Sequence, residues 1–375
     1  MNPHPEIAST LPIWQAALLL GPALAASVAA LFAGPGAGTA AAWRGARWAA
    51  LAAVGFAALS LAAVLSGATG AGHGLRADAM GGVVMLLVAF VGWVIVRYSQ
   101  PYLNGERQER HYVRWLMATL ATVGVVVATN HVLVLALAWT ATGLALHRLL
   151  TFFGERPPAV VAAQGREDQI GRQAAATPQL PFAAQAAVLL IACAALLKCA
   201  QLPFHGWLIQ VMEAPTPVSA LLHAGIVNLG GFVLMRFAPL VAEVPSAQVL
   251  LVAAGTATAV LAALVMTTRI SIKVMLAWST CAQMGFMLMQ CGLGAWEMAL
   301  LHLVAHSLYK AHAFLGAGGA VRRAMLVQLT PRAAAPGPLA LALGALAGVG
   351  MTLAAGAAWS LLLPGQAVSP AIWVL

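Results

Sequence analysis

The sequence predicts an all-α fold: a polytopic membrane helix bundle of about 11–12 spans. Apolar residues make up 62% of the chain, only 8% of residues are charged, and the mean hydropathy is +0.89. Soluble domains carry about 25% charged residues. Between the charged stretches run apolar segments of about 18 residues or more, long enough to cross a hydrocarbon core about 30 Å thick. Lipid offers backbone groups no hydrogen-bond partner, so these segments must be helices.

Eleven spans can be drawn from the apolar runs, all within a single transmembrane domain of residues 1–375. They cover residues 11–33, 46–66, 80–97, 112–128, 131–150, 183–208, 217–237, 246–267, 272–292, 296–320 and 338–363. The longest stretch without a span is a polar connecting segment at residues 151–182.

The basic loop residues give a second view of the topology, because cytoplasmic loops are rich in Lys and Arg. If eleven spans alternate, ten arginines before residue 183 fall on one side and the later basic loops on the other. One extra crossing within residues 151–182 would return these loops to the cytoplasmic side. Either that segment crosses in a shielded or irregular way, or a helix present in relatives is missing. We expect a multi-pass protein of the cell inner (plasma) membrane.

The net charge of +9 and the pI of 10.1 come largely from these loops. A nucleic-acid partner needs a basic stripe on a soluble face, so we expect membrane lipid and no nucleic acid around the chain. The four cysteines stand in apolar runs without a CxxC pair, as small buried hydrophobes do; a metal or disulfide role is the weaker alternative. We expect no metal site and no cofactor.

Lys198 is the most informative ionisable residue, because a charge at membrane depth usually marks an ion pathway or a proton relay. It stands far from either end of its apolar run, where a lysine does not easily reach water. Burial disfavours the charged form, so Lys198 can gain and lose a proton near neutrality. A structural pair with a carboxylate is the alternative. Pro203 follows and predicts a broken helix, since proline removes a backbone donor.

Three further candidates follow Pro203 along the chain: His205, Glu213 and His223. Broken membrane helices free carbonyl groups and water sites that pass ions, and His205 and Glu213 come directly after the predicted break. Glu213 could instead cap the next helix or stay solvated at a span end. Histidine titrates near neutrality, and Lys198 is the candidate partner of His223. A neutral, hydrogen-bonded core histidine is the alternative.

A second cluster consists of His302, His306, Lys310 and His312 on one predicted span. Steps of four place the first three along one helix face, as a ladder of proton acceptors about 12 Å long. A hydrogen-bonded network without transport is the alternative. Lys273 opens the preceding span and could either join this route or snorkel to the interface.

Four segments resemble the proton-translocating antiporter family: residues 198–208 (KCAQLPFHGWL), 213–224 (EAPTPVSALLHA), 271–273 (SIK) and 302–315 (HLVAHSLYKAHAFL). That family includes the large membrane subunits of respiratory NADH:quinone oxidoreductase and the Mrp cation/proton antiporters. The resemblance covers about residues 80–325. It implies that Lys198 carries the proton at a broken helix and that His223 and Lys273 continue a polar axis.

One departure from the family pattern concerns the partner of the lysine. The family's fifth helix carries a glutamate after a tryptophan, whereas here Thr140 follows Trp139. With residues 306–314 (HSLYKAHAF), this departure looks most like the membrane subunits of DAB inorganic-carbon accumulation complexes. That resemblance implies a large soluble, zinc-containing, carbonic-anhydrase-like (DabA-like) partner, to which the zinc chemistry would belong.

Three functions are weighed. The first is a cation (proton) translocating membrane subunit of an inorganic-carbon uptake complex, not itself an enzyme, which couples ion flow to hydration of CO2 to bicarbonate by the zinc partner. The second is a cation/proton antiporter or respiratory NADH:quinone oxidoreductase membrane subunit; Thr140 disfavours it, because a paired carboxylate tunes the lysine. The third is a non-conducting scaffold, which the buried Lys198 and the His302 ladder disfavour.

Overall fold

The computed structural model describes residues 11–34, 38–151, 182–319 and 337–362. These residues belong to two compact units, Met1–Gly318 and Gly319–Leu375, and each is described by itself. The polar connecting segment predicted at residues 151–182, with its extra crossing, lies almost entirely outside the described residues. The single transmembrane domain predicted for residues 1–375 stays a prediction.

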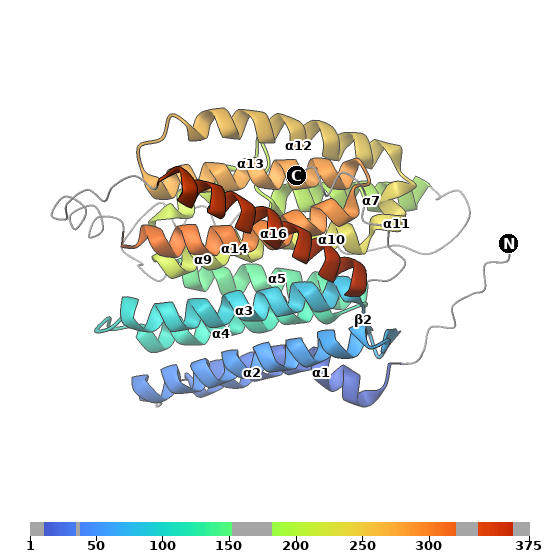
Figure 1. Ribbon diagram of the computed structural model, residues 1–375. Coiled ribbons are helices and arrows are strands. Elements are labelled where there is room, and N and C mark those ends of the chain that lie inside the picture. The colour runs from blue at the N-terminus through green and yellow to red at the C-terminus, as the bar shows by residue number, and fades with distance from the viewer. Residues whose placement is uncertain (1–10, 35–37, 152–181, 320–336, 363–375) are drawn as a thin grey trace. The chain divides into compact units, whose positions relative to one another are not determined.

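Long helices dominate the first unit (Figure 1). They are α1 (Ile13–Phe32), α2 (Thr39–Leu65), α3 (Ala79–Tyr102), α4 (Glu109–Ala128), α5 (Val132–Leu150), α7 (Phe182–Lys198), α12 (Pro245–Met266), α13 (Ile272–Gly292) and α14 (Trp296–Ala317). Shorter helices follow α7: α8 (Gly206–Gln210), η2 (Val211–Glu213), α9 (Thr216–Ala224), η3 (Ile226–Asn228), α10 (Leu229–Arg236) and α11 (Ala238–Ala242). The second unit contains α16 (Pro338–Leu362).

These helices confirm the all-α, polytopic membrane fold. Within the described ranges, eight helical segments are long and apolar enough to cross a membrane. Each of the eleven predicted spans coincides with one described helix or with a broken series of helices. The sequence pattern succeeds here because a bilayer imposes both the length and the apolar composition of every span.

A small β-hairpin precedes α3 and was not predicted. Its strands, β1 (Gly70–Gly72) and β2 (Leu75–Ala77), pair antiparallel through a turn in which Gly74 has φ +74°. The Gly74 carbonyl accepts hydrogen bonds from the Asn130 amide (2.7 Å) and the Thr129 hydroxyl (3.1 Å). The hairpin therefore lies against the turn between α4 and α5, and strands this short leave no hydropathy pattern in the sequence.

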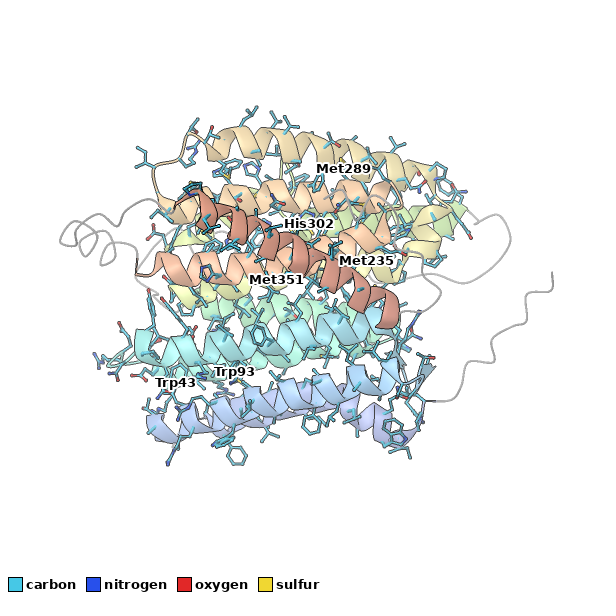
Figure 2. All side chains as sticks on the ribbon, viewed as in Figure 1. Trp43, Trp93, Met235, Met289, His302 and Met351 are labelled. Atoms are coloured by element: carbon cyan, nitrogen blue, oxygen red, sulfur yellow. The ribbon has the colours of Figure 1, made fainter. Side chains whose placement is uncertain are left out.

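Helix α2 begins at Thr39, seven residues before the predicted start at residue 46. The helix includes Arg44 and Arg47, which were counted among the loop arginines. Its 27 residues correspond to a length of about 40 Å, more than the thickness of the hydrocarbon core. Trp43 in this first part is buried, and its Nε1 donates to the Glu109 carboxylate at 2.7 Å (Figure 2). The extension is thus held by a contact with α4.

Two of the spans are broken. Helix α7 ends at Lys198 and α8 begins at Gly206, so the break predicted near Pro203 is confirmed. The span of residues 217–237 is also interrupted, at Gly225 between α9 and η3, which the sequence reasoning missed. A Cβ at Gly225 would lie 2.9 Å from the Leu221 carbonyl oxygen, so the backbone there requires glycine.

Helices α12 and α13 pack closely through glycines. A Cβ on either Gly255 or Gly285 would lie 2.6 Å from the carbonyl oxygen of the other, and one on Gly292 would lie 2.8 Å from the Gln248 carbonyl oxygen. Small residues allow such close approach between membrane helices. This contact fixes α13, which supplies the partners of two α14 side chains described below.

Gly285→Ala should destabilise this helix pair, because the added methyl group has no room. We expect a loss of about 1–3 kcal/mol, measured as a lower melting temperature of the detergent-purified protein. Gly45→Ala on α2 is the matched control, since nothing lies within 4 Å of its added Cβ and alanine favours a helix over glycine. Equal melting temperatures for the two variants would contradict the close packing.

Candidate functional site

The first part of the candidate site is the break after α7. Lys198 is half-buried, and its Nζ lies 5.8 Å from the centroid of the Trp139 indole on α5. The Thr140 hydroxyl donates to the Ala136 carbonyl at 3.0 Å. Helix α5 therefore presents an indole face to the lysine, next to the position at which the family pattern has a carboxylate.

Three hydrogen bonds hold the break in place. The Cys199 thiol donates to the Val227 carbonyl (3.3 Å), the Gln201 amide to the Cys199 carbonyl (2.8 Å), and the Leu202 amide to the Thr258 hydroxyl (3.1 Å). These bonds connect the non-helical residues to η3 and to α12. The break is a defined structure, because its freed backbone groups have specific partners.

His205 and Glu213 lie on the other side of this break. The His205 ring is 4.8 Å from the ring of Trp278 on α13, and its buried Nδ1 has no hydrogen-bond partner among the described residues. Glu213 is the last residue of η2 and is exposed, as the solvated alternative requires. The expected roles of both residues stay predictions.

Two further lysines donate to backbone carbonyls. The Nζ of Lys273 donates to the Ala214 carbonyl (3.0 Å), between η2 and α9. The Nζ of Lys310 is fully buried and donates to the Leu276 carbonyl (3.1 Å) and the Ser279 hydroxyl (2.7 Å) of α13. Oxygen acceptors of this kind stabilise an ammonium group in a site without bulk water.

His223 is fully buried on α9 and stacks on Phe314 of α14, with ring centroids 4.3 Å apart and an interplanar angle of 19°. Neither ring nitrogen has a hydrogen-bond partner in the described part of the chain. Lys310 and His306 interact electrostatically with this ring. The structure thus joins His223 to the α14 cluster, and the expected link between His223 and Lys198 stays a prediction.

The α14 cluster follows the predicted ladder for three of its four members. His302 (labelled in Figure 2) lies on α14. Its Nδ1 lies 3.1 Å from the Gln290 Oε1 on α13, and its ring centroid lies 6.1 Å from that of the buried His306. His306 in turn interacts electrostatically with Lys310. His312 is exposed, because its two-residue step from Lys310 turns it away from this face. Its role in the pathway stays a prediction.

Sequence reasoning missed the polar contact at the second break. The buried Asn228 donates to the Ser307 hydroxyl of α14 (2.6 Å) and to the Ala224 carbonyl (3.0 Å). Beside them is a cavity of about 20 Å³, which Gly225 also lines, and this volume holds about one water molecule. An asparagine inside an apolar span was the available signal, since polar groups there rarely lack a function.

A second missed cluster surrounds Asp78, the N-cap of α3. Its carboxylate accepts from the Gly81 amide (2.8 Å) and forms ion pairs with Arg76 (2.8 Å) and with Arg236 at the end of α10. Arg236 also donates to the Val127 carbonyl of α4 at 3.1 Å. The cluster joins the hairpin to three helices, and Arg236 at a span end was its signal in the sequence.

No metal site emerges from the described residues: they contain no group of three or more His, Cys, Asp or Glu side chains arranged to hold an ion. The lysines and histidines of the candidate site are nitrogen bases, which take up and release protons. The lysines and histidines lie along the broken spans and α14, where neighbouring groups interact electrostatically.

Comparisons with known proteins find similar chains among membrane transport subunits. Residues 176–334 match the family described as NADH:quinone oxidoreductase/Mrp antiporter, TM. The chain is 50% identical over 281 residues to the probable inorganic carbon transporter subunit DabB of Hydrogenovibrio crunogenus, covering 68% of this chain and 54% of that protein. It is 41% identical over 343 residues to DabB2 of Halothiobacillus neapolitanus, covering 80% and 62%.

The structure of the Mrp complex from Dietzia sp. DQ12-45-1b superimposes with a TM-score of 0.68 at 27% identity, covering 80% of this chain and 37% of that chain. A helix bundle with a lysine at a broken span and a buried His–Lys ladder defines an antiporter-like membrane subunit. Over residues 176–334 the chain is similar to the NADH:quinone oxidoreductase/Mrp antiporter family, and it is a multi-pass protein of the inner membrane. It spans 54% and 62% of the length of the two DabB relatives. The chain is also similar to the DabB inorganic carbon transporter subunits, the resemblance that its sequence motifs predicted.

Proposed function

We propose that this chain is the proton-translocating membrane subunit of an inorganic-carbon uptake complex. The observation that carries the proposal is the series of buried or half-buried bases between the two broken spans and α14. Ionisable groups at membrane depth are costly and usually serve transport. The names of the DabB relatives supply the substrate class, inorganic carbon.

The proposed route begins at the break beside Lys198 and passes to His223. From there Lys310 and His306, which interact with His223, carry the proton along α14 toward His302. Lys273 provides a branch of the route at the first turn of α13, where its Nζ donates to the Ala214 carbonyl. Each step transfers a proton from one nitrogen base to the next, and histidines and buried lysines are the side chains that form proton relays inside membranes.

The proposed partner is a large soluble, zinc-containing, carbonic-anhydrase-like subunit. Hydration of CO2 to bicarbonate would take place at the zinc of that partner, and proton flow through this chain would make the conversion one-way. This chain is then a transporter subunit and not an enzyme. The relatives named above are likewise called transporter subunits.

A second candidate function is that of a cation/proton antiporter or respiratory membrane subunit. The likeness to the Mrp complex favours it. Thr140 disfavours it, because the carboxylate that tunes the lysine in that pattern is absent from this position.

The test is Lys198→Ala in a tagged chain, in cells that depend on it at ambient CO2. We expect growth at ambient CO2 to be lost and growth at high CO2 to be normal, because the proton carrier is gone. The variant should still co-purify one large soluble zinc protein in stoichiometric amount. Unchanged growth of the Lys198→Ala cells at ambient CO2 would contradict the proposal. Co-purification of flavin or iron–sulfur proteins instead would support the second function, a cation/proton antiporter or respiratory membrane subunit.

A further inference from the structure

We propose that Trp139 is a positioning residue for Lys198: its indole face holds the ammonium group and sets the pH range over which Lys198 keeps its proton. The inference rests on the proposed function and adds a residue to it. It concerns the position on α5 at which this chain has Thr140 and the family pattern has the glutamate that pairs with the lysine.

The geometry supports a cation–π contact. The Nζ of Lys198 lies 5.8 Å from the indole centroid, inside the distance of about 6 Å at which a ring attracts a cation. Tryptophan attracts cations more strongly than the other aromatic residues, and the attraction grows when the pair is removed from water. Both side chains are half-buried in the bundle.

The surrounding backbone favours the same protonation state. Lys198 is the last residue of α7, and the negative end of the helix dipole stabilises a cation there. The Trp207 indole donates to the Leu197 carbonyl at 3.3 Å, so a second tryptophan, from beyond the break, contacts the backbone of this last turn.

Ionisable groups lie on several of the described elements around Lys198. Cys199 interacts electrostatically with Lys198, and α12, which packs on α7, carries no ionisable side chain. The only charged residue of α10 is Arg236 at its far end, and α5 has His147 and Arg148 in its last turn. His205 follows on the other side of the break. On α5, the group observed to face the ammonium is the Trp139 indole.

Removing the ring should lower the proton affinity of Lys198, because an aromatic face stabilises only the charged form. Transport that needs a protonated Lys198 falls as pH rises through the midpoint at which the proton is lost. For Trp139→Leu we expect this midpoint to shift by about one unit to lower pH. Trp139→Phe keeps a weaker ring and should shift it less.

The experiment measures proton flux against pH in native membrane vesicles carrying the full chain, with a pH-sensitive dye and an imposed gradient. Trp48→Leu on α2 is the matched control, since Trp48 is exposed on the outside of the bundle and should leave the profile unchanged. A graded shift, with Trp139→Leu displaced more than Trp139→Phe, supports the inference.

Two results would overturn it. One is a native pH midpoint in Trp139→Leu; the other is an equal loss of flux in both Trp139 variants without any shift, which a packing role alone would produce. If Trp139→Leu does not assemble, the midpoint of Trp139→Phe decides. Lys198→Ala separates the two proposals. Native proton flux in that variant would contradict the proposed function. Lost flux in Lys198→Ala together with a native pH profile in Trp139→Leu would contradict only the role of Trp139.

Discussion

We expect Lys310→Met to stop most proton movement while the protein remains folded. Methionine is about as long as the aliphatic part of the lysine side chain, and it cannot carry a proton. Because Lys310 interacts with both buried histidines, its loss interrupts the route between them. We expect proton flux in membrane vesicles to fall by about 100-fold or more, the range that a single proton-transfer group contributes.

The fold should tolerate this change. Replacing a buried charge by an apolar side chain of similar volume is often neutral or stabilising. The Leu276 carbonyl keeps its second donor, the Thr280 hydroxyl at 3.0 Å. The melting temperature of the purified variant should therefore stay at or above that of the native protein.

Two controls accompany Lys310→Met. Leu308→Met on the same helix changes an exposed, apolar side chain and should leave the flux unchanged. Ser279→Ala removes one of the acceptors of the ammonium and should give an intermediate loss. Native flux in Lys310→Met would show that protons bypass the α14 cluster.

The sequence predicted this cluster because the spacing of residues on one helix is determined by the helix itself. His302, His306 and Lys310 share a face through steps of four, and the exposed His312 departs from it for the same geometric reason. The partners on α13 could not be predicted. Gln290 and Ser279 meet α14 only through the packing of two antiparallel helices, and no periodicity within one segment specifies which residues face each other.

The breaks show a similar limit. Pro203 predicts the first break, because proline removes a backbone hydrogen-bond donor in any helix. Gly225 gives no such signal, since glycine is common in unbroken membrane helices, and only the three-dimensional structure shows that no Cβ fits there. The hydrogen bond from Asn228 to Ser307 depends on that second break and was missed with it.

Asp78→Ala should cost more stability than any surface substitution in this chain. It leaves the guanidinium of Arg236, whose side chain is only 9% exposed, without its carboxylate. Removing one partner of a buried ion pair typically costs about 3–5 kcal/mol, because the remaining charge stays desolvated. The N-cap of α3 is lost as well, which adds about 1 kcal/mol. We expect a much lower melting temperature and little purified protein.

A second substitution tests whether the stranded charge is the cause. Arg236→Met in the Asp78→Ala background removes that charge and should restore most of the lost stability, leaving mainly the cost of the cap. A double-mutant cycle of these changes measures the coupling between the two side chains. Glu243→Ala, which removes an exposed carboxylate, should melt like the native protein. If Asp78→Ala melted like Glu243→Ala, the ion pair would have no structural role, and the join between the hairpin, α3 and α10 would have to come from apolar packing.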